Sequence, residues 1–222
     1  MATVDAYGTP IGGQTRNPFN YVKVEQLARD NTTAWLTQTE VTNQLNLFGD
    51  TSQDTYLAAI ELATRQAIED YLGLSIFATT YRVWYGTESL VASPVCFDLP
   101  EVSQNSNSAL SGVTISFVKY YNDAFPPVVT TISNTEYFYD NSGNKVIVSS
   151  MPTSVNTVMT APIYIDYVTA ANPMAAYPVI KQAGLLLLTH LYNNRSNTTD
   201  IQLKDIPFGV ANLLRPYKPL VM

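Results

Sequence analysis

The spacing of apolar positions predicts helices towards both ends of the chain. Between residues 54 and 72, apolar side chains recur at intervals of three, four and one, which places them on one face of an amphipathic helix. Gly73 follows at the position where a left-handed residue ends a helix. Glu61 and Arg65 are four residues apart and are expected on the outer side of this helix. The apolar stripe consists of Leu57, Ile60, Ala63, Ala67, Ile68 and Tyr71.

A shorter helix is predicted over residues 38–47, because the signals of a helix start come just before it. Thr37 is a residue type that caps free N–H groups, and Glu40 stands three positions later, where it closes a capping box. Leu36 and Val41 occupy the two positions of a hydrophobic staple. The sequence therefore specifies the entry into the first helical region in detail.

The third predicted helix, over residues 178–194, is apolar around most of its circumference and begins at a proline. Such a helix must be covered on several sides, so we expect it at the centre of the helical core. A short fourth helix is predicted over residues 208–215, followed by an extended tail. The residues expected at the structural core of the third helix are Ile180, Ala183, Leu187, His190 and Leu191.

Between residues 78 and 170 the pattern changes to the alternation of apolar and polar residues that is typical of strands. Residues 141–144 predict a hairpin turn with Gly143 in the left-handed conformation. Residues 21–30 are compatible with a strand or a short helix, and the pattern leaves this open. The predicted strands are Thr80–Tyr85, Val95–Leu99, Val113–Tyr121, Val128–Ile132, Glu136–Tyr139, Lys145–Val148 and Ile163–Val168.

These elements together predict an α+β fold, in which a small helical bundle carries an inserted antiparallel β-sheet region. The helical core is expected to combine residues 36–77 with residues 171–215, around a β region over 78–170. An extended N-terminal arm is expected over residues 1–35 and a C-terminal docking tail over residues 216–222.

Charge is distributed unevenly along a chain whose net charge is −6. Residues 1–172 hold 7 basic and 16 acidic side chains (−9), whereas residues 173–222 hold 5 basic and 2 acidic ones (+3). An acidic body repels nucleic acid, so we do not expect it to grip DNA. The 15 tyrosines suit protein interfaces, because a tyrosine buries its ring while its hydroxyl stays hydrated. We expect the basic C-terminal stretch to face an acidic protein surface.

No residue pattern supports catalysis or metal binding. The single histidine, His190, lies in the apolar third helix, and the single cysteine, Cys96, has no base beside it in the sequence. Glu69 and Asp70 are adjacent on a helix and so point about 100° apart, which does not make a catalytic carboxylate pair. We therefore expect no catalytic, metal or cofactor site and no enzymatic activity. The longest apolar run, Ala183–Leu188, is far shorter than the about 20 residues of a membrane span.

Three blocks of the sequence, in order, resemble the head-to-tail connector (adaptor) proteins of tailed bacteriophages. The first block runs from Leu36 to Gly73 and contains the capping box and the second helix. The second block, over residues 97–137, is looser. The third block, over residues 179–217, is the most specific and includes His190-Leu191-Tyr192-Asn193-Asn194-Arg195 and Ile206-Pro207-Phe208-Gly209-Val210.

The resemblance implies a structural virion protein in the neck of the particle, at the head–tail interface. Such a subunit forms a homo-oligomeric ring, expected to be twelvefold, that docks to the portal protein after DNA packaging in the host cytoplasm. The ring extends the DNA channel without binding DNA specifically, contacts no membrane, and carries the downstream neck or tail protein. The portal-docking residues that the resemblance implies are Leu214, Arg215, Tyr217, Lys218, Leu220 and Val221.

Three alternatives stay open. Another neck part, such as a stopper or tail-completion protein, would use the β region as its functional body. A β-rich carbohydrate-binding module would explain the tyrosines and the sheet, although the apolar third helix is atypical of such modules. A hydrolase that uses scattered Asp and Glu residues has no spacing to support it.

Overall fold

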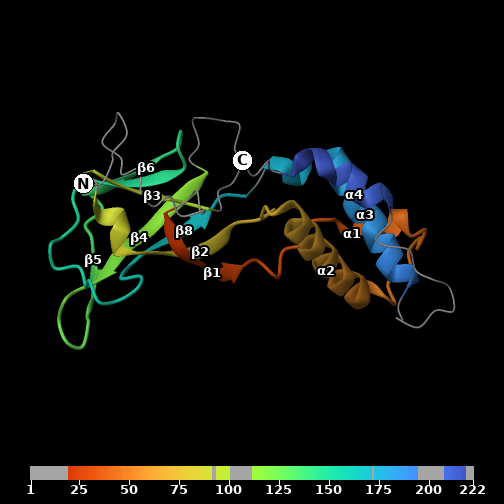
Figure 1. Cartoon of the computed structure of the whole chain (residues 1–222). Coiled ribbons are helices and arrows are strands. Elements are labelled where there is room, and N and C mark those ends of the chain that lie inside the picture. The colour runs from red at the N-terminus through yellow and green to blue at the C-terminus, as the bar shows by residue number, and fades with distance from the viewer. Residues whose placement is uncertain (1–19, 92–93, 101–111, 172, 195–207, 219–222) are drawn as a thin grey trace. The chain divides into compact units, whose positions relative to one another are not determined.

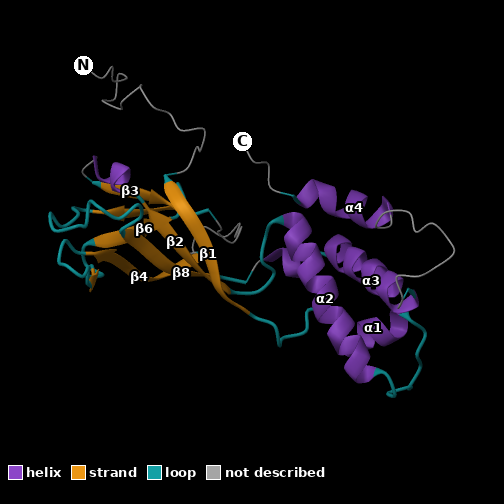
Figure 2. Cartoon of the chain, turned by 60° about the horizontal axis from the view of Figure 1, so that its bottom comes forward, coloured by secondary structure: helices purple, strands orange, loops and turns teal. Residues whose placement is uncertain are grey.

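The computed structural model describes residues 20–91, 94–100, 112–171, 173–194 and 208–218 (Figure 1). The chain divides into two compact units. The β unit comprises residues 1–27, 80–101 and 113–168, and the helical unit comprises residues 28–79, 102–112 and 169–222. Among the described residues the strands gather in one unit and the four α-helices in the other (Figure 2), which confirms the predicted α+β class.

The described strands form two sheets. The strands are β1 (Tyr21–Arg29), β2 (Thr79–Tyr85), β3 (Val95–Asp98), β4 (Val113–Tyr121), β5 (Val129–Thr131), β6 (Tyr137–Asp140), β7 (Lys145–Val148) and β8 (Ile163–Thr169). The larger sheet has the order β1–β2–β8–β4–β5, and the smaller one has the order β3–β7–β6. The pairs β2–β8, β4–β5, β3–β7 and β6–β7 are antiparallel, as predicted.

Buried side chains from the strands form the core of the β unit. In β2 every second residue is buried, and its partner strand β8 is buried along almost its whole length. The ring of Tyr85 in β2 lies 4.6 Å from the ring of Phe97 in β3, measured between centroids, so the two sheets pack through these faces. Burial raises the pKa of Tyr85, whose hydroxyl donates a hydrogen bond to the carbonyl of Asp98 (2.7 Å).

The structure settles one open expectation in this region and corrects another. Residues 21–29, which the pattern left undecided, form β1 at the edge of the larger sheet, while residues 1–19 of the predicted arm lie outside the described residues. In the β6–β7 hairpin the left-handed residue is Asn144 (φ 52°), not Gly143. Asparagine tolerates this conformation. Gly143 serves a different need, because a Cβ atom there would lie 3.0 Å from Oδ2 of Asp140.

The helices of the helical unit begin and end where local chemistry directs them. They are α1 (Gln38–Gln44), α2 (Asp54–Leu72), α3 (Pro178–Asn193) and α4 (Phe208–Leu214), with the short 3₁₀ segments η2 (Pro173–Ala176) and η3 (Arg215–Tyr217). The capping box of Thr37 and Glu40 is present as predicted, and Gly73 ends α2 with φ 68°.

Helix α1 ends at Gln44, three residues before the predicted end at residue 47. Asn46 adopts a left-handed conformation (φ 57°), and the N–H of Leu47 donates to the carbonyl of Thr42 (3.0 Å). This pattern is a Schellman-type termination, for which asparagine can substitute for glycine. The predicted end at residue 47 was wrong because it took Gly49, the next glycine in the sequence, as the stop signal.

Helix α3 is the centre of the helical unit, as predicted. Ile180, Ala183 and Leu188 are fully buried, and α3 packs against α1, α2, α4 and η2. Gly184 lets Trp35 approach closely, because a Cβ atom on this glycine would lie 2.6 Å from Cζ3 of the tryptophan ring. Among the described residues, no helix is long and apolar enough to cross a membrane.

Candidate functional site

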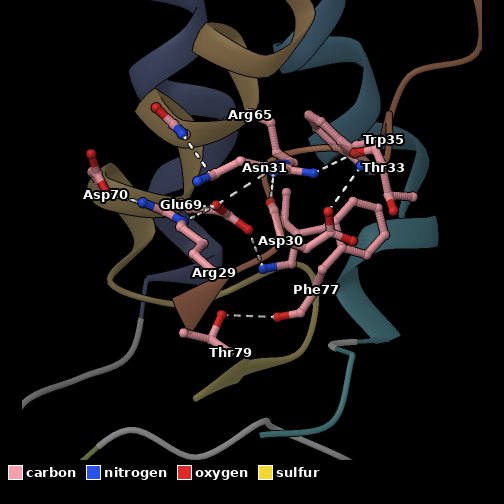
Figure 3. Close-up of polar contacts among 12 residues, drawn as sticks. Arg29, Asp30, Asn31, Thr33, Trp35, Arg65, Glu69, Asp70, Phe77 and Thr79 are labelled. Atoms are coloured by element: carbon pink, nitrogen blue, oxygen red, sulfur yellow. Dashed lines mark hydrogen bonds and ion pairs between the residues drawn. The ribbon is translucent and has the colours of Figure 1, made fainter. Parts of the chain in front are cut away.

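A cluster of buried polar side chains on α2 fixes the irregular segment that leads from β1 to α1 (Figure 3). Glu61 is 3% exposed, and its Oε1 accepts hydrogen bonds from the backbone N–H groups of Trp35 (2.8 Å) and Leu36 (3.0 Å). The carboxylate thereby supplies acceptors that the segment lacks within itself. The indole Nε1 of Trp35 donates to the carbonyl of Ala175 (2.9 Å), which ties the segment to η2 as well.

One turn further along α2, the guanidinium of Arg65 is completely buried. It donates hydrogen bonds to the carbonyls of Asp30 and Thr33 in the same segment. It also lies over the ring of Phe77, 4.9 Å from the centroid, and 4.0 Å from the carboxylate of Glu69. Carbonyls, ring and carboxylate together compensate a charge that would otherwise be costly to bury.

Arg29, at the end of β1, completes the cluster (Figure 3). Its Nε donates to Oε2 of Glu69 (2.9 Å), and its Nη1 lies 3.4 Å from Oδ1 of Asp70. The other oxygen of Glu69 accepts from the N–H of Ile76 (2.7 Å). Glu69 is almost fully buried and Asp70 is exposed, so the two carboxylates face different surroundings, as expected for adjacent helical residues.

The sequence pattern misassigned this face of α2. Glu61 and Arg65 were expected outside but are buried, whereas Ala63 and Ala67 of the predicted apolar stripe are exposed. The reason is that α2 packs against an irregular segment whose backbone groups need polar partners. The available signal was the series Glu61, Arg65 and Glu69, which alternates in charge along one face at intervals of four.

Two further carboxylates stabilise the start of the helical unit. Hydrogen bonds from Thr33 and Thr32 hold the pKa of Asp30 well below its usual range. Glu40 accepts a hydrogen bond from Nζ of Lys181 in α3 (2.8 Å) and another from the N–H of Thr37. These two bonds lower the pKa of Glu40, the one from Lys181 more strongly.

The predicted core residues of α3 occupy two environments. Ile180, Ala183 and Leu187 are buried in the helical unit, whereas His190 and Leu191 are half-buried. His190 Nδ1 lies 3.3 Å from the side-chain amide of Asn194.

The predicted docking residues are divided between core and surface. Leu214 is 1% exposed and belongs to the core of the helical unit, so we leave it out of any docking surface. Arg215 is exposed, and Tyr217 packs its ring 5.8 Å from that of Tyr177. Lys218 is exposed and lies over the ring of Tyr71 (5.2 Å to the centroid). Leu220 and Val221 lie outside the described residues.

The described residues contain no group of three or more His, Cys, Asp or Glu side chains that could hold a metal ion. Cys96 lies in β3 with its backbone carbonyl accepting a hydrogen bond from the side chain of Asn20 (2.5 Å). Glu61 and Arg65 direct their hydrogen bonds to backbone groups of residues 30–36, although Oε2 of Glu61 and Nε of Arg65 are buried without a hydrogen-bond partner.

The aromatic residues on one face of the larger sheet contact one another. The rings of Trp84 and Tyr164 are 4.8 Å apart, and Arg82 lies over Tyr164 (4.5 Å) while its guanidinium pairs with Asp166 (2.7 Å). The indole of Trp84 also donates to Glu25 (2.8 Å). Tyr164 is only 6% exposed, so its ring offers little open surface of the kind a sugar would need, whereas Trp84 is half-buried.

Comparisons with known proteins show what this fold resembles. No protein-family model and no curated protein matches the sequence. The structure is similar to a chain from the neck of an empty gene transfer agent (GTA) particle computed with C6 symmetry (TM-score 0.60, 19% identity). It is also similar to chains from the virion of a native GTA particle (TM-score 0.55, 16% identity) and from the neck of a native GTA particle computed with C12 symmetry (TM-score 0.53, 15% identity). Each match covers 90% of this chain and 97% of the other chain, so both units share one fold with these proteins.

Proposed function

We propose that the chain is a structural protein of the neck of a tailed, phage-like particle. The observation that carries the proposal is that 90% of this chain shares its fold with chains from the necks of GTA particles. The sequence resemblance to phage connector proteins points to the same place in a particle. A structural role also agrees with the polar clusters of the described residues, which satisfy backbone groups rather than converge on a substrate.

Within the neck, we propose that the chain is the connector (adaptor) subunit, which forms a twelvefold ring, docks to the portal and extends the DNA channel. The neck structures with similar chains were computed with C6 and C12 symmetry, which supports a ring. The net charge of −9 over residues 1–172 supports a place beside the DNA channel, because a negatively charged protein repels DNA and does not retain it as it passes. The chain would act without catalysing a reaction.

We assign portal docking to the exposed basic end of the helical unit. Arg215 and Lys218 are exposed in the segment after α4, and residues 173–222, which contain them, carry a net charge of +3. The chemistry suits an acidic portal surface, and charge pairs at the rim of such an interface would speed association. Tyr217, held against Tyr177, adds a ring of a type common at interfaces.

Charge reversal tests the docking assignment. In co-sedimentation with the portal protein of the same particle, Arg215→Glu should weaken binding, most strongly at low salt. Lys23→Glu is the matched control, because the Lys23 side chain is 61% exposed and belongs to the β unit, outside the proposed docking end. Equal binding by both variants would reject the docking surface. Absence of the chain from the neck in a map of the particle would reject the function itself.

A further inference from the structure

The segment that carries the proposed docking cations is anchored in the helical unit at its base. Helix α4 packs against α3 (Figure 2), and its Val210 and Leu214 are buried in the core of this unit. The 3₁₀ segment η3 continues directly from α4 and contains Pro216, whose ring fixes its φ angle. The N–H of Lys218 donates to the carbonyl of Arg215 (3.3 Å) and closes this turn. The backbone that leads to Lys218 is therefore fixed to the helices beneath it.

Two tyrosine rings from other helices restrain the side chains at the end of this segment. The ring of Tyr177, the residue directly before α3, lies 5.8 Å from that of Tyr217, with the two planes tilted by 58°. Tyr71, in the last turn of α2, lies against Lys218, whose Nζ is 5.2 Å from the centroid of the ring. This distance is within the range of a cation–π interaction. The hydroxyl of Tyr71 donates to the carbonyl of Ala211 (3.3 Å), so this ring is itself fixed to α4.

These contacts leave the two cations of the segment accessible. Arg215 and Lys218 are both exposed. Within the described part of the chain, neither of them forms an ion pair. The face of a tyrosine ring attracts an ammonium group but, unlike a carboxylate, does not neutralise its charge. The segment therefore presents a restrained ammonium group and an exposed guanidinium, and both are available to the acidic groups of a partner.

We propose that Tyr71 and Tyr177 are positioning residues for portal docking, which hold Lys218 and Tyr217 in the arrangement that docks before the portal is met. The inference rests on the proposed function, because it concerns the docking surface named there. A free lysine side chain populates many rotamers, and ordering it on binding costs conformational entropy. A side chain that a ring already restrains loses less of this entropy when the complex forms. The two tyrosines thus strengthen docking through the residues that they hold.

Replacing a ring without changing any charge tests this role. In surface plasmon resonance with the portal protein of the same particle, Tyr71→Leu should raise the Kd about two- to tenfold, the range expected for one side chain that must be ordered on binding. Tyr71→Phe, which keeps the ring and loses only the hydroxyl bond to α4, should retain most of the native affinity. Tyr177→Leu and Tyr177→Phe should differ in the same way. Tyr56→Leu is the matched control, because Tyr56 is also a half-buried tyrosine of α2 and its ring contacts Tyr192; it should bind with the native Kd.

A double-mutant cycle distinguishes positioning from a general loss of stability. In a Lys218→Met background there is no ammonium group for the ring of Tyr71 to hold, so Tyr71→Leu should change the Kd little. An equal loss of affinity with and without Lys218 would overturn the positioning role, because the ring would then act in another way. Tighter binding by Tyr71→Leu would overturn it as well, since the ring would then hold Lys218 away from the portal.

The native chain and Arg215→Glu, measured in the same assay, separate the two proposals. If the native chain binds the portal and Arg215→Glu weakens this binding, while Tyr71→Leu and Tyr177→Leu keep the native Kd, the positioning role is overturned and the proposed function stands. A native chain that does not bind the portal protein would overturn the proposed docking function, and the positioning role with it.

Discussion

Replacing Gly184 by alanine should destabilise the helical unit, although alanine is the better helix former. The propensity difference alone would stabilise α3 by about 1 kcal/mol. The added Cβ atom, however, would lie 2.6 Å from Cζ3 and 2.9 Å from Cη2 of Trp35, well inside normal contact. Trp35 cannot simply retreat, because its Nε1 is bonded to Ala175 and its backbone N–H to Glu61. Overpacking of a core costs about 1–3 kcal/mol. Breaking one of these hydrogen bonds would add about 1 kcal/mol.

The expected net effect of Gly184→Ala is therefore a loss of about 1–3 kcal/mol in the free energy of unfolding. With a urea dependence of about 2 kcal/mol per molar, a loss of 2 kcal/mol moves the midpoint of the helical transition down by about 1 M, followed by far-UV circular dichroism. Gly209→Ala is the matched control, because a Cβ atom there meets nothing within 4 Å, and it should raise the midpoint slightly.

A double-mutant cycle locates the clash. In a Trp35→Leu background the ring is gone, so Gly184→Ala should cost much less than in the native background. If alanine at position 184 costs the same with and without the tryptophan, or raises the midpoint as Gly209→Ala does, the close approach of Gly184 and Trp35 is not what limits this site.

Three other predictions concern the polar contacts of the helical unit. Glu61→Met leaves the N–H groups of Trp35 and Leu36 without their acceptor and should lower the free energy of unfolding by about 2–4 kcal/mol, measured by urea titration. Glu61→Gln keeps an acceptor and should lose less of this free energy. Equal losses for the two variants would contradict the acceptor role. Arg65→Lys should cost about 1–3 kcal/mol in the same assay, because one ammonium group cannot reproduce the planar fork that reaches Asp30 and Thr33; an unchanged midpoint would show that the fork is dispensable. The pKa of Glu40 is lowered in the folded state from an ordinary value of 4.5. Its contribution to stability is therefore present above pH 4.5 and is lost as the pH falls through the lower pKa of the folded state. On acidification the urea midpoint of Glu40→Gln should fall less than that of the native chain, and parallel pH profiles would argue against this linkage.

Local signals predicted the elements of this fold well. The capping box of Thr37 and Glu40, the glycine after α2 and the alternation in β2 each depend on residues close together in the sequence. Such signals do not decide between strand and helix for residues 21–30, which contain β1. Its burial pattern is irregular, since it lies at the edge of a sheet, and only pairing with a distant strand distinguishes it from a helix.

The contacts that define the surfaces were not predictable in the same way. Glu61 and Arg65 are buried because of a segment that has no periodicity of its own. Phe125 precedes two prolines, which in a sequence indicate a loop or the edge of a strand, whereas its full exposure is seen only in the structure. Sequence patterns report which side of an element is apolar, whereas these features depend on which elements meet.

The cluster of buried polar side chains on α2 has a consequence for how this region of the protein can vary. Glu61 and Arg65 bind main-chain atoms of residues 30–36, namely two carbonyl oxygens and two N–H groups that every non-proline residue possesses. The path of the segment is therefore encoded in the helix, and mutations along much of the segment leave these four anchor atoms in place. In distant relatives the acid and the base at these two helical positions should persist long after the residues that they hold have drifted apart.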